Sequence, residues 1–267
     1  MKFGAALPYI GAQDAAKLAH LAEQAGWDAV FMGDAVWCED PLIALTAAAM
    51  LTDRIRLGTM VLPAAFRTPF SLANQALALD RLSNGRLTLG IGAGATWMGW
   101  QAFSSLPADA PTRAALLDDT LHILRILFGR QQQDFSGNHH HLALSQLNPQ
   151  YYPPAPTQPG GPPLWVPALW NNPRNLAHCL LADGALLESL PANGTPQDPT
   201  PDDCAGLRAW LNQHHPAGTS ADLVVTTPLA NGTSQWAAAG ATWMVEPLWG
   251  QTVQGAAALL RKGPPAQ

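Results

Sequence analysis

Three glycines alternate with apolar residues where one strand-like segment ends. The run Leu87 to Ile91 has β character, and Gly90, Gly92 and Gly94 stand at its C-terminal end. This spacing lets the backbone bend sharply, or lets another molecule lie flat against it. No G-x-G-x-x-G motif enters a helix directly, so the glycines are only a weak sign of dinucleotide binding. The surrounding elements must decide between these two explanations.

Asp34 directly follows another strand-like segment and is the candidate for acid–base chemistry. A general base works best with a pKa near the pH of the cell, which an aspartate reaches only by burial. The alternative is a turn residue that ends the strand. Cys38 has no predicted base beside it, so we expect a small buried side chain and not a nucleophile.

Three consecutive histidines, His139 to His141, raise the question of a metal site. Adjacent residues of an extended segment point to opposite faces, so three in a row do not converge on one ion as zinc ligands do. Neither H-E-x-x-H nor C-x-x-C accompanies them. We therefore predict no metal site.

Strand-like and helix-like segments alternate along the chain and must position these residues. Strands are predicted at 2–9, 27–34, 55–63, 86–94, 163–169, 183–189, 221–227 and 241–248. Helices are predicted at 14–26, 40–53, 68–85, 111–129, 171–182, 201–215, 232–240 and 252–262. Asp40 and Thr68 stand as N-caps, each followed by a proline at the first helical position.

Eight such units favour a closed (β/α)8 TIM barrel of the α/β class over an open doubly wound sheet. The 267 residues fit one barrel domain over 1–267. The polar segment 130–163, rich in Pro and Gly, is predicted to be an excursion at the barrel mouth between units four and five.

The composition excludes several classes of protein. The net charge is −5, from 14 Lys and Arg against 19 Asp and Glu, which is unlike a nucleic-acid-binding surface. No apolar run reaches the roughly 18 residues of a membrane span, and the first residues show no signal peptide. The three widely spaced cysteines indicate a reduced, cytoplasmic protein without a disulfide framework.

Active sites of (β/α)8 barrels lie at the C-terminal ends of the strands. The candidate substrate-pocket residues there are Tyr9, Trp37, Trp97, Trp170 and Glu246. A mouth lined by indoles and floored by glycines suits a flat aromatic ligand. The alternative is that the tryptophans cap the barrel and the glycines only relieve crowding.

Several motifs together resemble the bacterial luciferase-like monooxygenases. They are T-D-R-I-R-L-G-T (52–59), R-T-P (67–69) and L-D-R-L-S-N-G-R (79–86), which runs into L-G-I-G-A-G (89–94). Looser matches, F-S-G-N-H-H-H-L, P-P-L-W-V and L-A-D-G-A, extend the resemblance over almost the whole chain. The resemblance implies a barrel that binds FMN or, as the alternative, 8-hydroxy-5-deazaflavin. It also implies a small-molecule substrate, a flavin reductase as redox partner and a homodimer. The charge and the lack of a long apolar run predict no nucleic-acid or membrane partner.

The resemblance also implies roles for residues at the ends of the third and fourth strands. A bulge after Thr59 supports the coenzyme ring in this family, often with a non-prolyl cis peptide, for which Met60–Val61 is the candidate. Gly92 and Gly94 would let the backbone approach the coenzyme and its phosphate-bearing tail. An ordinary trans strand is the alternative.

The coenzyme phosphate is expected at the start of the fifth helix, where Asn171, Asn172 and Arg174 stand. A helix N-terminus and a guanidinium both favour an anion. In the alternative, Asn172 is only an N-cap and Arg174 is solvated. Many relatives carry a histidine after the acid of strand two, but Ala35 follows Asp34 here.

We therefore expect a flavin-dependent oxidoreductase or monooxygenase that acts on a small organic substrate. Two alternatives remain, a non-catalytic flavin-binding barrel and a deazaflavin-dependent hydride-transfer enzyme. A metal-dependent barrel hydrolase would need convergent His and Asp ligands, which the strand ends do not show.

Overall fold

The computed structural model describes residues 1–36, 38–95, 99–102, 107, 109–152, 154–170, 172–189, 198–215 and 220–266. The strands are β1 (Lys2–Ala6), β2 (Ala29–Met32), β3 (Arg56–Thr59), β4 (Leu62–Pro63), β5 (Leu87–Gly92), β6 (Phe135–Ser136), β7 (His141–Leu142), β8 (Leu164–Trp170), β9 (Gly184–Ser189), β10 (Asp222–Thr226) and β11 (Trp243–Pro247). The α-helices are α1 (Ala12–Gln24), α2 (Pro41–Leu51), α3 (Pro69–Leu82), α4 (Ala110–Phe128), α5 (Pro173–Cys179), α6 (Pro201–His214), α7 (Ser234–Ala238) and α8 (Val253–Leu260). Short 3-10 turns are η1 (Ala64–Phe66), η3 (Trp100–Ala102), η4 (Leu144–Gln146), η5 (Pro149–Tyr151) and η6 (Leu229–Asn231).

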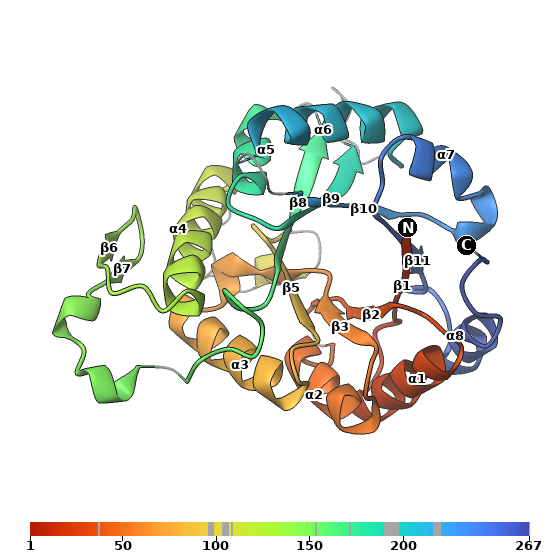
Figure 1. Cartoon of the computed structure of the whole chain (residues 1–267), viewed down its shortest axis with the longest axis horizontal. Coiled ribbons are helices and arrows are strands. Elements are labelled where there is room, and N and C mark those ends of the chain that lie inside the picture. Colours follow the sequence, from red (N-terminus) through yellow and green to blue (C-terminus); the bar gives the residue numbers. More distant parts are fainter. Residues whose placement is uncertain are drawn as a thin grey trace.

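Eight parallel strands close into a barrel, in the order β3-β2-β1-β11-β10-β9-β8-β5. A further pairing of β3 with β5 completes the ring, and the short β4 runs beside the end of β5. The α-helices surround the ring on its outside (Figure 1). The predicted (β/α)8 barrel is confirmed. None of the helices in the described ranges combines the length and apolar character that crossing a bilayer requires.

The second and third helices begin at the predicted caps. The Asp40 side chain accepts from the backbone N–H groups of Leu42 and Ile43, and the Thr68 side chain accepts from that of Ser71. In both helices proline takes the first position, where its missing N–H would have had no partner within the helix. These caps fix where the chain leaves the barrel mouth.

Three aromatic side chains fill the barrel interior. The ring of Phe31 lies 5.4 Å from that of Trp165 and 6.3 Å from that of Trp243, measured between centroids. Gly4 and Gly58 flank Phe31, and a Cβ on either residue would collide with its ring. The two glycines therefore make room for a large ring in a narrow barrel. The sequence analysis did not identify this cluster.

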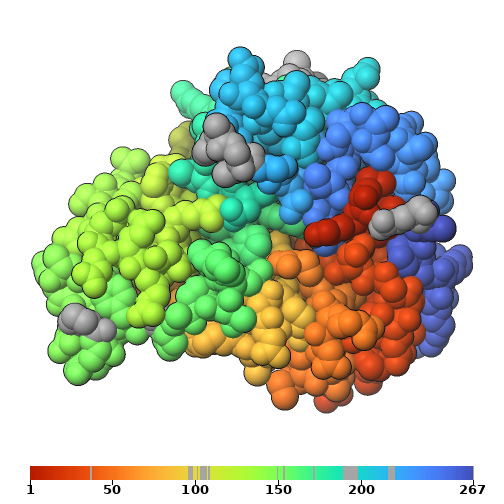
Figure 2. Space-filling model, in the orientation of Figure 1, coloured from red at the N-terminus to blue at the C-terminus, as the bar shows by residue number. Residues whose placement is uncertain are grey.

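The sequence analysis predicted that the excursion 130–163 lies at the barrel mouth, but the structure places it elsewhere. Its described residues pack outside α3 and α4 and project sideways from the barrel (Figures 1 and 2). The Asp119 carboxylate on α4 accepts the backbone N–H groups of Asn138, His139 and His140, at 3.1, 2.7 and 2.9 Å. The prediction was wrong because a carboxylate on the outer face of α4 satisfies the donors of the β6–β7 hairpin.

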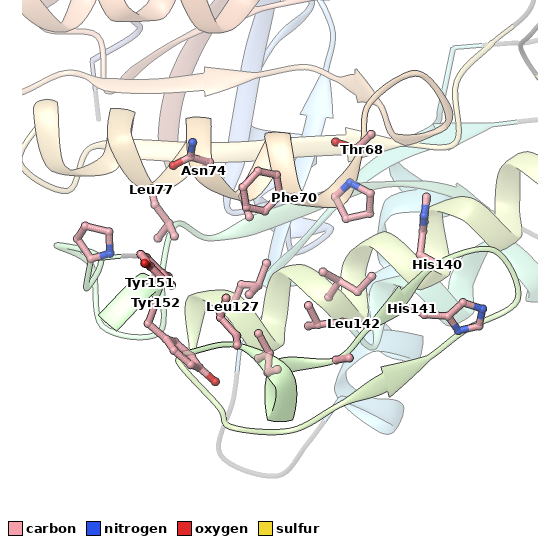
Figure 3. Close-up of a pocket in the computed structure, with 17 residues that line it drawn as sticks. Thr68, Phe70, Asn74, Leu77, Leu127, His140, His141, Leu142, Tyr151 and Tyr152 are labelled. Atoms are coloured by element: carbon pink, nitrogen blue, oxygen red, sulfur yellow. The ribbon is translucent and has the colours of Figure 1, made fainter. Parts of the chain in front are cut away.

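A groove of about 670 Å³ separates this excursion from α3 and α4. Apolar side chains dominate its lining, among them Phe70, Leu77, Leu127, Leu142 and Tyr152 (Figure 3). The groove lies outside the barrel, so it is distinct from the mouth where the candidate site residues gather.

Candidate functional site

Met60 and Val61 form an apolar shelf at the C-terminal end of the barrel. The peptide bond between them is cis, as predicted. Both side chains are half-buried and pack against the interior aromatic cluster. The Met60 Sδ lies 3.8 Å from the Oγ1 of Thr226 on β10, the strand opposite β3 in the ring. The Met60 side chain therefore extends across the barrel axis.

The alternating glycines have different reasons. Thr59 donates from its hydroxyl to the carbonyl of Gly90 at 2.7 Å, and a Cβ on Gly90 would collide with the Thr59 carbonyl. Gly94 has a φ of +90°, which favours glycine. Close packing of the chain thus explains Gly90, and backbone conformation explains Gly94. Gly92 borders the shelf, where a Cβ would lie 3.1 Å from Val61 Cγ2.

Asp34 is held in an ion pair that the sequence analysis did not identify. Arg67 Nη2 lies 2.8 Å from Asp34 Oδ2 and 3.0 Å from Asp40 Oδ2. The Asp34 side chain is 7% exposed and that of Arg67 18%. Burial raises the pKa of Asp34, and Arg67 opposes that rise. Because the carboxylate already has a cation as partner, its role as a free base is weakened. The R-T-P motif before α3 contains Arg67 and was the feature of the sequence from which this ion pair could have been inferred.

A small polar cavity of about 210 Å³ adjoins this ion pair. Its lining is formed by Asp34, Ala35, Val36, Cys38, Asp40, Arg67 and Trp100. The methyl group of Ala35 occupies the place where the resemblance implies a histidine. Burial, with the charge of Asp34 as the next cause, raises the pKa of the Cys38 thiol, which disfavours a thiolate nucleophile.

Tyr9 lies beside this cavity, across Gly33 at the end of β2. A Cβ on Gly33 would approach the Tyr9 hydroxyl to 3.0 Å, so glycine lets the phenol lie against the strand end. Burial raises the pKa of Tyr9, and the nearby Cys38 and Asp34 add to the rise. Tyr9 is thus a neutral phenol at the mouth, which keeps it as a candidate pocket residue.

Trp170 and Glu246 do not line the mouth, so these two predictions were wrong. Successive strand residues alternate between the two faces of a sheet, and Trp165 and Trp243 face inward. Trp170 and Glu246 each stand an odd number of positions further on and so face outward. The Trp170 ring packs against Gly206 on α6, and the Glu246 carboxylate accepts the N–H of Leu229 at 2.7 Å. Trp37, Trp97 and Asn171 lie outside the described residues.

The start of α5 gives a mixed result for the predicted phosphate site. The side-chain oxygen of Asn172 accepts the N–H of Asn175 at 3.3 Å, so Asn172 is an N-cap, as the alternative proposed. Arg174 is exposed and has no hydrogen bond or ion pair with the described residues. Its role as a phosphate ligand stays a prediction. A second guanidinium, which the sequence analysis missed, reaches the mouth from α4, where Arg113 Nε donates to the Gly94 carbonyl at 3.2 Å.

Residues 2–240 match the family model described as luciferase-like monooxygenase. The chain belongs to the luciferase-like monooxygenase family. It is 37% identical over 153 residues to a Mycobacterium tuberculosis protein assigned to the coenzyme F420-dependent oxidoreductases. The aligned segment covers 54% of this chain and 42% of that protein. It is 36% identical over 118 residues to 4-hydroxyprotoasukamycin monooxygenase from Streptomyces nodosus subsp. asukaensis, which covers 42% of this chain and 31% of the enzyme.

The barrel also superimposes on a solved structure of similar size. The monooxygenase RslO1 from Streptomyces bottropensis matches with a TM-score of 0.75 and 19% identity, over 98% of this chain and 97% of that one. At this identity the likeness establishes the fold. The chain spans less than half the length of the two curated relatives named above.

Proposed function

We propose that this luciferase-like chain binds an isoalloxazine-type coenzyme at its barrel mouth and transfers a hydride or oxygen to a small organic substrate. The observation that carries the proposal is the apolar shelf of Met60 and Val61, which extends across the barrel axis at the end where barrel enzymes bind their ligands. A flat ring can rest on such a shelf. Gly92 leaves the edge of the shelf without a side chain. The described residues therefore fit the ring of the coenzyme.

The residues of the chain would bind and orient the ligands. The coenzyme, when bound, supplies the hydride or oxygen chemistry itself. Met60 and Val61 support the ring, and Tyr9 offers a neutral hydroxyl at the mouth. Arg67 fixes the position and charge of Asp34. Arg174 is exposed and has no partner among the described residues, so a coenzyme phosphate could bind it.

The choice of coenzyme is open to a direct test. The resemblance implies FMN, with 8-hydroxy-5-deazaflavin as the alternative, and the assignment of the M. tuberculosis relative to the coenzyme F420-dependent oxidoreductases supports the alternative. Trp165 and Trp243 lie in the cluster directly against the shelf, so a bound ring should quench their fluorescence. We expect saturable quenching by FMN, reduced FMN or the deazaflavin. If none of the three binds below millimolar concentration, the proposal is wrong.

One observation favours a second candidate function, a coenzyme-binding barrel without catalysis. Asp34 is engaged by Arg67, and Ala35 carries no proton-transfer group. Reoxidation of the bound reduced coenzyme, measured with oxygen and a panel of small carbonyl and aromatic compounds, separates the two functions. Binding without any turnover would support the second candidate.

We further propose that the chain forms a homodimer through α2. Ile43, Met50 and Leu51 are 58%, 68% and 52% exposed and lie on one helical stripe. No charged residue occurs in Pro41–Leu51, and large exposed apolar patches mark interaction surfaces. Light scattering after gel filtration should report a dimer that Met50→Lys converts to a monomer. Leu180→Lys, at an exposed leucine that follows α5 and not α2, should leave the dimer intact.

A cytoplasmic location is proposed from the cysteines. Cys38, Cys179 and Cys204 are all free. Burial raises the pKa of Cys179 to about 12 and that of Cys204 to about 11, so both thiols stay protonated. Free thiols persist in reducing compartments. Cell fractionation tests this assignment, and a flavin reductase co-purifying from that fraction would identify the redox partner that FMN chemistry requires.

A further inference from the structure

Glu188 stands at the C-terminal end of β9, on the side of the strand that faces the barrel interior. Leu186, two positions earlier, belongs to the interior cluster, whereas Leu187 belongs to the outer core. Side chains alternate along a strand, so the Glu188 side chain is on the same face as Leu186. Its neighbour on β8 is Leu169. Glu188 therefore borders the mouth at the level of the shelf.

The carboxyl of Glu188 has no partner among the described residues. Other acids of this end of the barrel are engaged, since Asp34 and Asp40 bind Arg67 and Glu246 accepts a backbone N–H. Glu188 has neither a hydrogen bond nor an ion pair within the described ranges, and it is accessible from the mouth.

Among the described residues, no opposite charge lies beside Glu188. Leu169 faces it from β8, Thr226 occupies the corresponding end of β10, and Met60 extends across the axis to Thr226. None of these side chains titrates. Burial alone raises the pKa of Glu188, which agrees with a carboxyl that water reaches from above while barrel walls surround it. A solvated acid on a convex surface would show no such rise.

We propose that Glu188 contacts the substrate in the barrel mouth and selects groups that carry positive charge or donate a hydrogen bond. An unpaired carboxylate with low-dielectric walls attracts a cation and repels an anion more strongly than a solvated one does. Leaving the carboxylate unpaired in the free protein thus disfavours anionic substrates, which is selection by repulsion as well as attraction. This inference rests on the proposed function only in placing the substrate above the Met60–Val61 shelf.

The test compares two probes of similar size and opposite charge, benzylamine and benzoate, in coenzyme-free protein. Binding is followed by quenching of tryptophan fluorescence at alkaline pH, because burial raises the pKa of Glu188 and alkaline pH favours its charged form. We expect the wild-type chain to bind benzylamine more tightly than benzoate by on the order of tenfold, the ratio that one modest charge–charge interaction produces. Glu188→Gln keeps the shape of the side chain and should abolish this preference.

A matched control and a pH series make the result decisive. Glu246→Gln changes the same residue type at the same end of the barrel, on the outer face, and should keep the preference. In the wild type the preference should fade as pH decreases through the raised pKa of Glu188, because protonation removes the charge. An equal preference in wild type and Glu188→Gln, or no binding of either probe, would overturn the inference. Flavin titration is independent, so failure of the proposed function would be seen separately.

Discussion

The ion pair of Arg67 with Asp34 and Asp40 should dominate the stability of the barrel mouth. In Arg67→Met the side-chain volume is nearly kept, but Asp34, which is 7% exposed, loses the cation 2.8 Å away. Removing one partner of a buried pair costs about 3–5 kcal/mol, because an uncompensated charge stays in the interior. Arg67 is 18% and Asp40 32% exposed, so water screens part of this loss. We therefore expect a loss near the lower end, about 3 kcal/mol.

Urea denaturation at neutral pH, followed by tryptophan fluorescence, measures this loss as a change in the free energy of unfolding. A matched control is Lys17→Met, which removes an exposed pair with Asp14 whose side chains are 69% and 45% exposed. Such surface pairs contribute about 0–1 kcal/mol. The double variant Asp34→Asn with Arg67→Met removes the buried carboxylate together with its cation and should regain much of the stability, because the carboxylate that still loses Arg67 is the more exposed Asp40, which keeps its N-cap bonds to α2.

The pH dependence checks the cause. Burial already raises the pKa of Asp34, and without Arg67 that pKa should rise further. A carboxyl whose folded pKa is raised favours folding at low pH and loses this contribution as pH rises through the folded pKa. The deficit of Arg67→Met should therefore be largest at neutral pH and shrink in acid. A loss no larger than that of Lys17→Met, or a deficit independent of pH, would refute the reasoning.

Three further outcomes follow from single contacts. Gly90→Ala should destabilise the barrel by about 1–3 kcal/mol in urea, since its Cβ collides with the Thr59 carbonyl, whereas Gly250→Ala, in open space, should be neutral. Arg174→Ala should weaken FMN binding by about 1.5–3 kcal/mol and leave riboflavin unchanged; equal losses for both would exclude a phosphate contact. Burial tends to raise the pKa of Asp119, but hydrogen bonds from three backbone N–H groups lower it overall. The ionised carboxylate therefore stabilises the folded state, and this contribution is lost as pH falls through the lowered pKa. Asp119→Asn should flatten acid denaturation curves, and an unchanged curve would exclude this role.

The alternation of apolar segments and capped helix starts was sufficient to predict the barrel. Parallel strands buried on both faces need helices between them, and the caps at Asp40 and Thr68 act within a few residues of the chain. The position of the Met60–Val61 bond followed from the family resemblance, which the contiguous motif ending at Thr59 carries. Such features can be predicted from the sequence because the interacting groups are neighbours along the chain.

The composition of the site depended on contacts between distant segments. The sequence predicted the strand on which a residue stands, but not whether its side chain faces the barrel interior or the helices. It placed Trp170 and Glu246 correctly at strand ends. The closed ring shows that both side chains face outward. Arg67 reaches Asp34 across 33 positions. The accommodation of Phe31 by two glycines of other strands is likewise a tertiary event. Side-chain direction, ion pairing and burial depend on contacts between segments that are distant along the chain. A pattern of neighbouring residues therefore does not predict them.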